Sequence, residues 1–214
     1  MDLVFVRHAE SLGNAQGRWQ GRLDSELTDL GRRQAARLRE RFASEGFEPT
    51  HIYSSPLSRT HETARIVSAD WDHAIAPLDD LMEIDVGVFE GKTWDEIERE
   101  FPDLARQFAE TRDWDLVPGA ETLGQRRGRA LAAVTRLIAD HSNGDRVLAF
   151  THGGIIQHLF AVLMDSQRLW GMSVRNTALF EFTLDVDRWN QNGSAITNST
   201  LWRINRFNDA SHLG

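Results

Sequence analysis

Cysteine is absent from this sequence of 214 residues. Its absence excludes disulfides, thiolate metal sites, iron–sulfur clusters and a cysteine nucleophile. Lysine is nearly absent too, because Lys92 is the only one among 24 basic residues. A strong anion site must therefore be built from arginine, whose planar guanidinium group makes paired hydrogen bonds to phosphate. Apolar runs such as 159–164 are far shorter than the roughly 20 residues that a transmembrane helix needs.

The rest of the composition is that of an ordinary globular protein, with 41% hydrophobic and 26% charged residues. A chain of this length corresponds to a single domain. The formal net charge of −8 argues against general nucleic-acid binding, which requires a basic surface. The N-terminus has Asp2 and only a short apolar run before Arg7, unlike a secretory signal peptide. We therefore expect a cytoplasmic protein with no nucleic-acid or membrane partner.

Short apolar segments alternate with amphipathic segments along the chain. Strands are expected at 3–6, 51–54, 75–78, 146–150, 178–184 and 200–207. Helices are expected at 29–44, 57–69, 93–112 with a break at Pro102, 122–141, and from about 155 onward. This alternation predicts an α/β fold, a three-layer sandwich with a mostly parallel central sheet, helices on both faces, one antiparallel edge and a helical insertion. The insertion, at about 84–117, is expected to cover part of a single domain spanning 1–214.

Polar residues follow two of these strands directly. Arg7-His8 comes after the first strand, and Thr151-His152-Gly153 comes after the strand at 146–150. In open α/β sheets, ligands bind beyond the carboxyl ends of the strands. Both histidines are therefore expected to line one crevice.

Three metal or nucleotide motifs begin in the sequence but are not completed. The segment 87–93 has three residues between its glycines, where a phosphate-binding P-loop needs four. His8-Ala9-Glu10 matches half of a zinc deaminase signature, whose other half requires cysteines. His61-Glu62 opens a zincin motif, but Arg65 stands where its second histidine belongs. We therefore expect chemistry that uses neither a protein-bound metal nor a cofactor.

Five reactive residues form a consistent set for phosphoryl transfer: Arg7, Arg59, His8, His152 and Glu83. Arginine side chains and the backbone N–H groups of a helix N-terminus, here at Gly153, stabilise a dianionic phosphoryl group. An imidazole can act as the nucleophile. A carboxyl group can protonate the leaving oxygen.

With these residues in place, the sequence resembles the histidine phosphatase superfamily, also called the phosphoglycerate mutase-like family. The motifs that carry the resemblance occur in the family's order and span most of the chain. They are Val6-Arg7-His8-Ala9-Glu10-Ser11 with Asn14, Gln20-Gly21-Arg22-Leu23-Asp24, Leu27-Thr28-Asp29-Leu30-Gly31, Ser54-Ser55-Pro56-Leu57-Ser58-Arg59-Thr60, Leu81-Met82-Glu83, Gly119-Ala120-Glu121-Thr122 and Thr151-His152-Gly153-Gly154. The resemblance implies the fold expected above and a covalent mechanism.

The resemblance also implies a role for each reactive residue. His8 would attack phosphorus and become phosphohistidine, while Glu83 would protonate the leaving alcohol and then help to deprotonate water. The phosphoryl oxygens would be held by Arg7, Asn14, Arg59, His152 and Gly153. A candidate substrate loop comprises Gln20, Gly21 and Arg22. Because His8 must be neutral and His152 protonated, we expect their pKa values to be pushed apart.

Several other residues have both a structural and a functional interpretation. Glu10 and Asp24 could be catalytic carboxylates, but structural hydrogen bonding is favoured for both, and Thr28 is favoured as a helix cap. Glu121 is left open between contacting the site and not. The candidates for a leaving-group pocket, beside Arg22, are the aromatic residues Trp19, Trp94, Phe101, Phe108 and Trp114. For these aromatic residues, packing of the insertion onto the domain is the favoured interpretation.

The family contains both hydrolases and cofactor-dependent mutases. Its mutases carry Arg-His-Tyr-Gly after the acidic residue, whereas here Glu83 is followed by Ile84-Asp85-Val86-Gly87. We therefore favour a metal-independent phosphomonoesterase that acts on a small phosphorylated metabolite without a cofactor. The alternatives are a phosphoglycerate mutase and a catalytically silent phospho-ligand binding protein, and the intact reactive set argues against the silent one. The resemblance leaves a homodimer open, in which the segment 178–184 or its neighbours could pair at an edge.

Overall fold

A single mixed sheet forms the centre of the computed structural model, which describes residues 1–191 and 193–214. Within these residues the strands are β1 (Asp2–Arg7), β2 (His51–Ser54), β3 (Ile75–Pro77), β4 (Arg146–Thr151), β5 (Leu179–Leu184) and β6 (Trp202–Asp209). They lie in the order β3-β2-β4-β1-β5-β6. Strands β1 to β4 are parallel to one another, whereas β5 runs antiparallel to its neighbours β1 and β6. The expected α/β fold with a mostly parallel sheet is confirmed.

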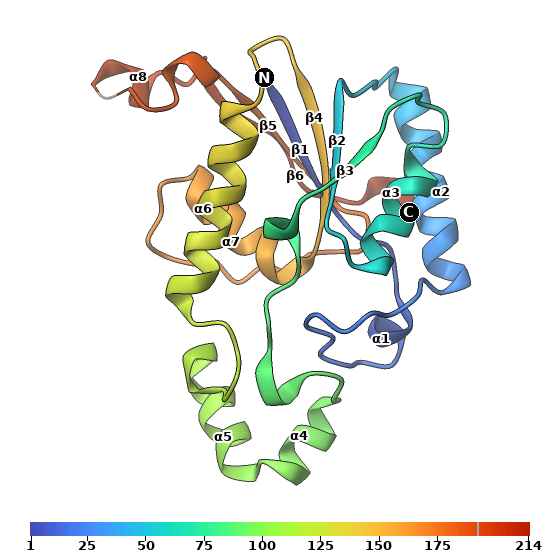
Figure 1. The fold of residues 1–214 in the computed structure, drawn as a ribbon, viewed down its shortest axis with the longest axis vertical. Coiled ribbons are helices and arrows are strands. Elements are labelled where there is room, and N and C mark those ends of the chain that lie inside the picture. The colour runs from blue at the N-terminus through green and yellow to red at the C-terminus, as the bar shows by residue number, and fades with distance from the viewer. Residues whose placement is uncertain (192) are drawn as a thin grey trace.

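Helices cover both faces of this sheet (Figure 1). On one side lie α2 (Asp29–Glu45) and α3 (Ser58–Val67), and on the other lie α6 (Leu123–Ala139) and α7 (Gly153–Leu163). Below the sheet in this view, α4 (Trp94–Glu100) and α5 (Pro102–Thr111) belong to the segment expected as an insertion. The remaining helices of the described residues are the short α1 (Leu12–Ala15) and α8 (Ser194–Thr197), besides several 3-10 turns. The three expected layers are present.

The side chains of β1 alternate between two apolar cores. Leu3 and Phe5 pack in a cluster with residues of α6 and α7, while Val4 and Val6 pack in a second cluster with residues of α2 and α3. This division follows from the strand itself, because successive side chains point to opposite faces of a sheet. None of the four is more than 1% exposed. The carboxyl end of β1, where the first polar motif begins, is therefore held firmly from both sides.

Local sequence signals set the helix boundaries as expected. The Thr28 side chain caps α2 by accepting a hydrogen bond from Gly31 N at 2.9 Å. Pro102 separates α4 from α5 and occupies the first turn of α5, where its missing N–H is harmless. The predicted break in the segment 93–112 is confirmed.

Two expectations about the sheet and its loops need correction. The segment 178–184 is not an edge, because β6 pairs with β5 on the side away from β1. The two edges in the described residues are β3 and β6. The helix α1 lies where only a polar loop was expected, and it is too short, at four residues, to show a helical pattern.

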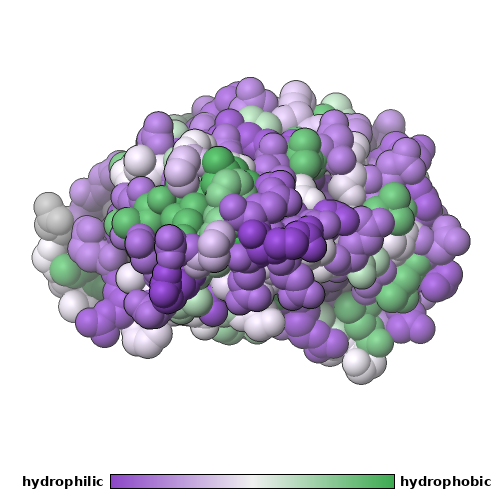
Figure 2. All heavy atoms as spheres, turned by 90° about the horizontal axis from the view of Figure 1, so that it is seen from below, coloured by the Kyte–Doolittle hydropathy of each residue, from purple (hydrophilic) through white to green (hydrophobic). Residues whose placement is uncertain are grey.

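The surface seen from below is mostly hydrophilic, with apolar residues gathered in a few separate patches (Figure 2). None of the helices in the described residues has the length and apolar character needed to cross a bilayer.

Candidate active site

Three neighbouring strands end at the same place and bring their polar motifs together. Arg7 lies directly opposite Thr151 in the β1–β4 pair, and His8 N donates to Thr151 O at 2.9 Å. On the other side of β4, Ser55 N donates to Phe150 O at 3.0 Å. The residues after β1, β2 and β4 therefore converge at the carboxyl edge of the sheet, as expected for a ligand site.

A cavity of about 460 Å³ opens at this edge. The predicted site residues that line it are Arg7, His8, Asn14, Gln20, Gly21, Arg59, Glu83 and Gly153. Two predicted residues, His152 and Arg22, are not among its lining residues. Most of the predicted site residues therefore line one cavity.

His8 is held at the cavity as a neutral imidazole. Its Nδ1 lies 2.7 Å from Ala9 O. Because a carbonyl oxygen only accepts, Nδ1 carries the proton and Nε2 keeps its lone pair. The side chain is buried, and this burial, followed by the charges of Arg7 and Arg59, holds the pKa of His8 well below its usual range. The imidazole is therefore uncharged at neutral pH.

His152 lies beside His8. The two ring centres are 5.1 Å apart, and His152 is fully buried. Its Nε2 lies 2.8 Å from Ser55 Oγ and 3.0 Å from Thr60 Oγ1. Burial, then the charge of Arg59, lowers the pKa of His152 well below its usual range. The pKa values of both histidines are lowered because the same desolvation and the same arginines act on both rings.

Arg7 and Arg59 both line the cavity and have N–H donors without a partner among the described residues. Arg59 Nη1 donates to Leu23 O at 2.7 Å and Nη2 to Gly21 O at 2.8 Å. Arg7 Nη1 donates to Val174 O. The Nε atoms of both arginines are buried and have no hydrogen-bond partner among the described residues. A buried N–H donor without an acceptor is costly, so these atoms favour an anion in the cavity.

The Glu83 carboxylate lies across the N-terminus of α7. Its Oε2 accepts from Gly154 N at 3.0 Å, and its Oε1 accepts from Ile155 N at 3.0 Å and from Ile84 N at 2.9 Å. These backbone donors fix the carboxylate at the wall of the cavity that also carries Gly153. A carboxyl group held beside the anion site can exchange a proton with a leaving oxygen.

The loop after β1 supplies the opposite wall. Asn14 and Gln20 both line the cavity and contact Ser11, whose Oγ lies 2.8 Å from Gln20 Oε1 and 3.1 Å from Asn14 Oδ1 and can donate its single proton to either oxygen. Arg22 turns away from the cavity, and its Nη2 lies 3.2 Å from Glu121 Oε1. Of the candidate substrate loop, Gln20 and Gly21 therefore reach the cavity and Arg22 does not.

Three aromatic residues line the cavity. Trp19, Phe108 and Trp114 line it and pack edge to face, with ring centres 5.1 Å apart for Trp19 and Trp114 and 4.7 Å apart for Phe108 and Trp114. Trp94 and Phe101 pack against the apolar core and are not lining residues. Phe108 belongs to this core, and Trp19 and Trp114 also pack against it, so the favoured packing interpretation applies to the whole set, three members of which also line the cavity.

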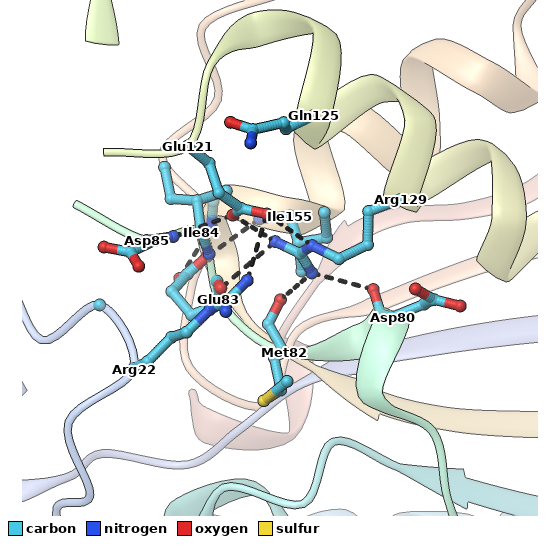
Figure 3. Close-up of polar contacts among 12 residues, drawn as sticks. Arg22, Asp80, Met82, Glu83, Ile84, Asp85, Glu121, Gln125, Arg129 and Ile155 are labelled. Atoms are coloured by element: carbon cyan, nitrogen blue, oxygen red, sulfur yellow. Dashed lines mark hydrogen bonds and ion pairs between the residues drawn. The ribbon is translucent and has the colours of Figure 1, made fainter. Parts of the chain in front are cut away.

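The structure also places some of the undecided polar residues. Glu10 Oε1 accepts from Thr28 Oγ1 at 2.7 Å, and Asp24 Oδ1 accepts from Ser58 N at 2.9 Å. These contacts agree with the favoured structural interpretation of both carboxylates. Glu121 lies outside the cavity, in an ion pair with Arg129 at 2.7 Å (Figure 3).

The segment 172–176 also borders the site, although no sequence motif indicates it. Met172, Ser173 and Val174 line the cavity, and Asn176 Nδ2 donates to His8 O at 3.1 Å. The contact of Val174 with Arg7 uses a backbone carbonyl, which any residue type provides. Only the fold reveals that this segment borders His8.

Comparison with known proteins gives a consistent result. The family model described as histidine phosphatase superfamily (branch 1) matches residues 3–197. Phosphoglycerate mutase-like protein 4 of Arabidopsis thaliana is 37% identical over 191 residues, which cover 88% of this chain and 82% of that protein. The metal-independent phosphoserine phosphatase of Arabidopsis thaliana is 30% identical over 193 residues, with 88% and 80% covered.

Solved structures agree. Bacillus stearothermophilus YhfR superposes with a TM-score of 0.82 and 31% identity, covering 100% of this chain and 99% of its own. The matched range includes every reactive residue that the sequence singled out. The chain belongs to branch 1 of the histidine phosphatase superfamily.

Proposed function

We propose that this protein is a metal-independent phosphomonoesterase that hydrolyses a small phosphorylated metabolite through phosphohistidine at His8. The observation that carries the proposal is the state of His8. Its Nδ1 is occupied by Ala9 O at 2.7 Å, its pKa is lowered by burial and by Arg7 and Arg59, and it lines the cavity. A neutral imidazole beside two cations with unused N–H donors is suited to attack a phosphate ester.

The first step transfers the phosphoryl group to the enzyme. His8 Nε2 attacks phosphorus in line, and the P–O bond to the leaving group breaks as the P–N bond forms. Glu83, acting from its carboxyl form, gives a proton to the leaving oxygen. Arg7 and Arg59 stabilise the charge on the three phosphoryl oxygens, with the Asn14 amide and Gly153 N–H as further donors.

The second step releases phosphate. The Glu83 carboxylate takes a proton from water, the resulting hydroxide attacks phosphorus, and the P–N bond breaks. Inorganic phosphate leaves, and His8 returns to the neutral form. We place His152 as a further stabiliser of the phosphoryl group because its ring lies 5.1 Å from that of His8. The arriving dianion would favour protonation of this ring.

The cavity is suited to a leaving group with apolar surface, because Trp19, Phe108 and Trp114 line it together with the reactive residues. Relatives named as a phosphoserine phosphatase and as a phosphoglycerate mutase-like protein support a small phosphorylated metabolite as the substrate class. A phosphoglycerate mutase is the second candidate, because the relative at 37% identity carries a mutase-like name.

Phosphate release in buffer containing a chelator tests the proposal. The panel consists of phenyl phosphate, 3-phosphoglycerate, phosphoserine, a sugar phosphate and a nucleotide. The wild type should release phosphate, and His8→Ala should be slower by a factor on the order of 10³ or more, as for loss of a nucleophile elsewhere. Undiminished release by His8→Ala would refute the nucleophile assignment. Isomerisation of phosphoglycerate without phosphate release would establish the mutase instead.

Glu83→Gln separates the acid from the nucleophile. Phenolate is a poorer leaving group than 4-nitrophenolate and needs the proton more. The variant should therefore hydrolyse phenyl phosphate about 10² or more times slower than wild type, with a much smaller loss for 4-nitrophenyl phosphate. Equal losses on both esters would mean that Glu83 does not act mainly as the acid.

A further inference from the structure

A buried charged network lies behind Glu83, outside the cavity (Figure 3). Its central pair is Arg129 on α6 and Glu121, which precedes α6, with Arg129 Nη2 2.7 Å from Glu121 Oε2 and both side chains 11% exposed. Neither residue lines the cavity, so neither contacts a substrate there. The network borders the segment that carries the proposed acid.

Arg129 holds the main chain of that segment. Its Nη1 donates to Asp80 O at 3.0 Å and to Met82 O at 2.6 Å, and its Nη2 donates to Glu83 O at 3.3 Å (Figure 3). Residues 82–86 lie between two 3-10 turns and form no helix or strand of their own. Carbonyl groups in irregular buried chain need a donor from elsewhere, and one guanidinium group supplies it here.

Glu121 holds both Arg129 and the far end of the segment. Its Oε1 accepts from Arg129 Nε at 2.9 Å, its Oε2 accepts from Asp85 N at 2.9 Å, and its own N–H donates to Asp85 O at 3.0 Å. Burial raises the pKa of Glu121, but the hydrogen bonds from Arg129 and Asp85 N outweigh it and lower the pKa below its ordinary value. The carboxylate is therefore charged at neutral pH.

Arg22 connects this network to the opposite wall of the site. Its Nη2 lies 3.2 Å from Glu121 Oε1. The carbonyl groups of its two neighbours, Gly21 and Leu23, accept the hydrogen bonds of Arg59. One carboxylate thus joins the segment that holds a phosphate-facing arginine to the segment that carries the proposed acid.

We propose that Arg129 and Glu121 are positioning residues that set Glu83 at the correct distance from the phosphoryl group, a role that rests on the proposed function. The Glu83 carboxylate is anchored at Gly154 N and Ile155 N, and its backbone is anchored by Arg129. A shift of the backbone anchor must break a carboxylate contact or move the carboxylate. Misplacement of a catalytic group by about 1 Å can lower the rate by about 10²-fold.

Two variants test the network kinetically. Arg129→Lys keeps the charge but cannot reach three carbonyls with one planar fork, and Glu121→Gln keeps the volume but removes the charge. For both variants, kcat on phenyl phosphate should fall about 10- to 100-fold, with KM changed less than about 3-fold. On 4-nitrophenyl phosphate, which has a similar shape but a better leaving group, kcat should fall less than about 3-fold.

Arg136→Lys is the matched control. Arg136 lies on the same helix, and its Nε is 3.5 Å from Asp140 Oδ2 in an exposed pair. This variant should behave as wild type on both esters. Equal slowing of the two esters by Arg129→Lys and Glu121→Gln, or no slowing, would overturn the positioning role.

Hydrogen exchange gives a readout that does not depend on turnover. The amides of Gly154, Ile155 and Asp85 receive their acceptors from Glu83 and Glu121. In Arg129→Lys and Glu121→Gln these amides, followed by NMR, should exchange at least about 10-fold faster than in wild type, while amides of β1 remain protected. Unchanged exchange would overturn the inference. A wild type that releases no phosphate would refute the proposed function alone, since the exchange result still stands.

Discussion

The Glu83 carboxylate can approach the start of α7 only because residue 154 has no side chain. A Cβ atom built on Gly154 would lie 2.5 Å from Glu83 Oε1 and 3.1 Å from Ile84 Cγ1. Gly154→Ala should therefore displace the carboxylate and lower kcat for phenyl phosphate by about 10²-fold. Steady-state kinetics of the variant beside wild type measures this loss.

Gly124→Ala is the control for that substitution. Gly124 is the second residue of α6, as Gly154 is the second residue of α7. The nearest atom to its added Cβ would be Thr122 Oγ1 at 4.0 Å, so the extra methyl group meets only ordinary contact. Its activity should equal that of wild type. Full activity in Gly154→Ala, or the same loss in both variants, would contradict the steric argument.

The types of residue at the site could be predicted from the sequence, but the direction in which each side chain points could not. His8, Arg59 and Glu83 stand in motifs, and all three reach the cavity. Arg22 stands in a motif as well, yet its guanidinium group lies beside Glu121 instead. The direction of a long side chain depends on which acceptor lies nearest in space, and that acceptor here is about a hundred residues away along the chain.

Backbone hydrogen bonds around Gly87 join the two ends of the segment that the sequence predicts as an insertion. Val86 pairs with Ala120 in an antiparallel bridge, and Val88 N donates to Pro118 O at 3.0 Å. Gly87 has a φ of 55°, and a Cβ atom there would lie 2.2 Å from Pro118 O, which is backbone. Gly87→Ala should therefore destabilise the protein by about 2 kcal/mol or more, through strain at positive φ and overpacking. Urea unfolding gives the free energy.

Gly128→Ala provides the comparison at the same scale. Gly128 lies inside α6, and nothing lies within 4 Å of an added Cβ. Alanine is the better helix former, so this variant should be more stable than wild type by about 0.5–1 kcal/mol. Opposite signs for the two glycine substitutions are the expected result. A stable Gly87→Ala would show that the tie between the two ends can relax.

Helix boundaries were predictable because their causes are local. Thr28 and Pro102 act within one turn of the helix that each one starts. The place of β5 was not predictable, since strand order depends on contacts between distant segments. In the sheet, β4 lies between β1 and β2, and β6 pairs with the outer side of β5. The residues of β4 and β6 do not indicate which strands they will pair with. Any pairing of two copies along the sheet would therefore use β3 or β6.

At the scale of the whole molecule, burial lowers the pKa of several histidines, so that they stay neutral in the folded protein at neutral pH. The pKa is lowered for His8, His152, His158 and His212. Burial, then the charges of Arg126, Arg129 and Arg127, lowers the pKa of His158 from 6.5 to about 4, against a smaller opposing effect of Glu121. The unfolded chain binds protons near pH 6.5 that the folded protein does not accept.

The sign of the pH dependence follows from this difference in bound protons. Stability rises with pH wherever the unfolded state holds more protons, so the free energy of unfolding should fall as pH drops from about 7 to 5. Each such histidine contributes a slope of up to about 1.4 kcal/mol per pH unit below its unfolded pKa. Urea unfolding at closely spaced pH values measures the slope.

His158→Leu isolates one contribution without altering the reactive set, because His158 is buried on α7 and does not line the cavity. Between about pH 5 and 6, the free energy of unfolding of this variant should change less steeply with pH than that of wild type, by about 1 kcal/mol per pH unit. The comparison uses slopes because the absolute stability also changes with packing. An unchanged slope in His158→Leu would mean that His158 is protonated in the folded protein. Because the charge of Arg126 helps to lower the pKa of His158, that result would also mean that a counterion nearer than Asp115 neutralises Arg126. Asp115 Oδ1 lies 3.0 Å from Arg126 Nη2.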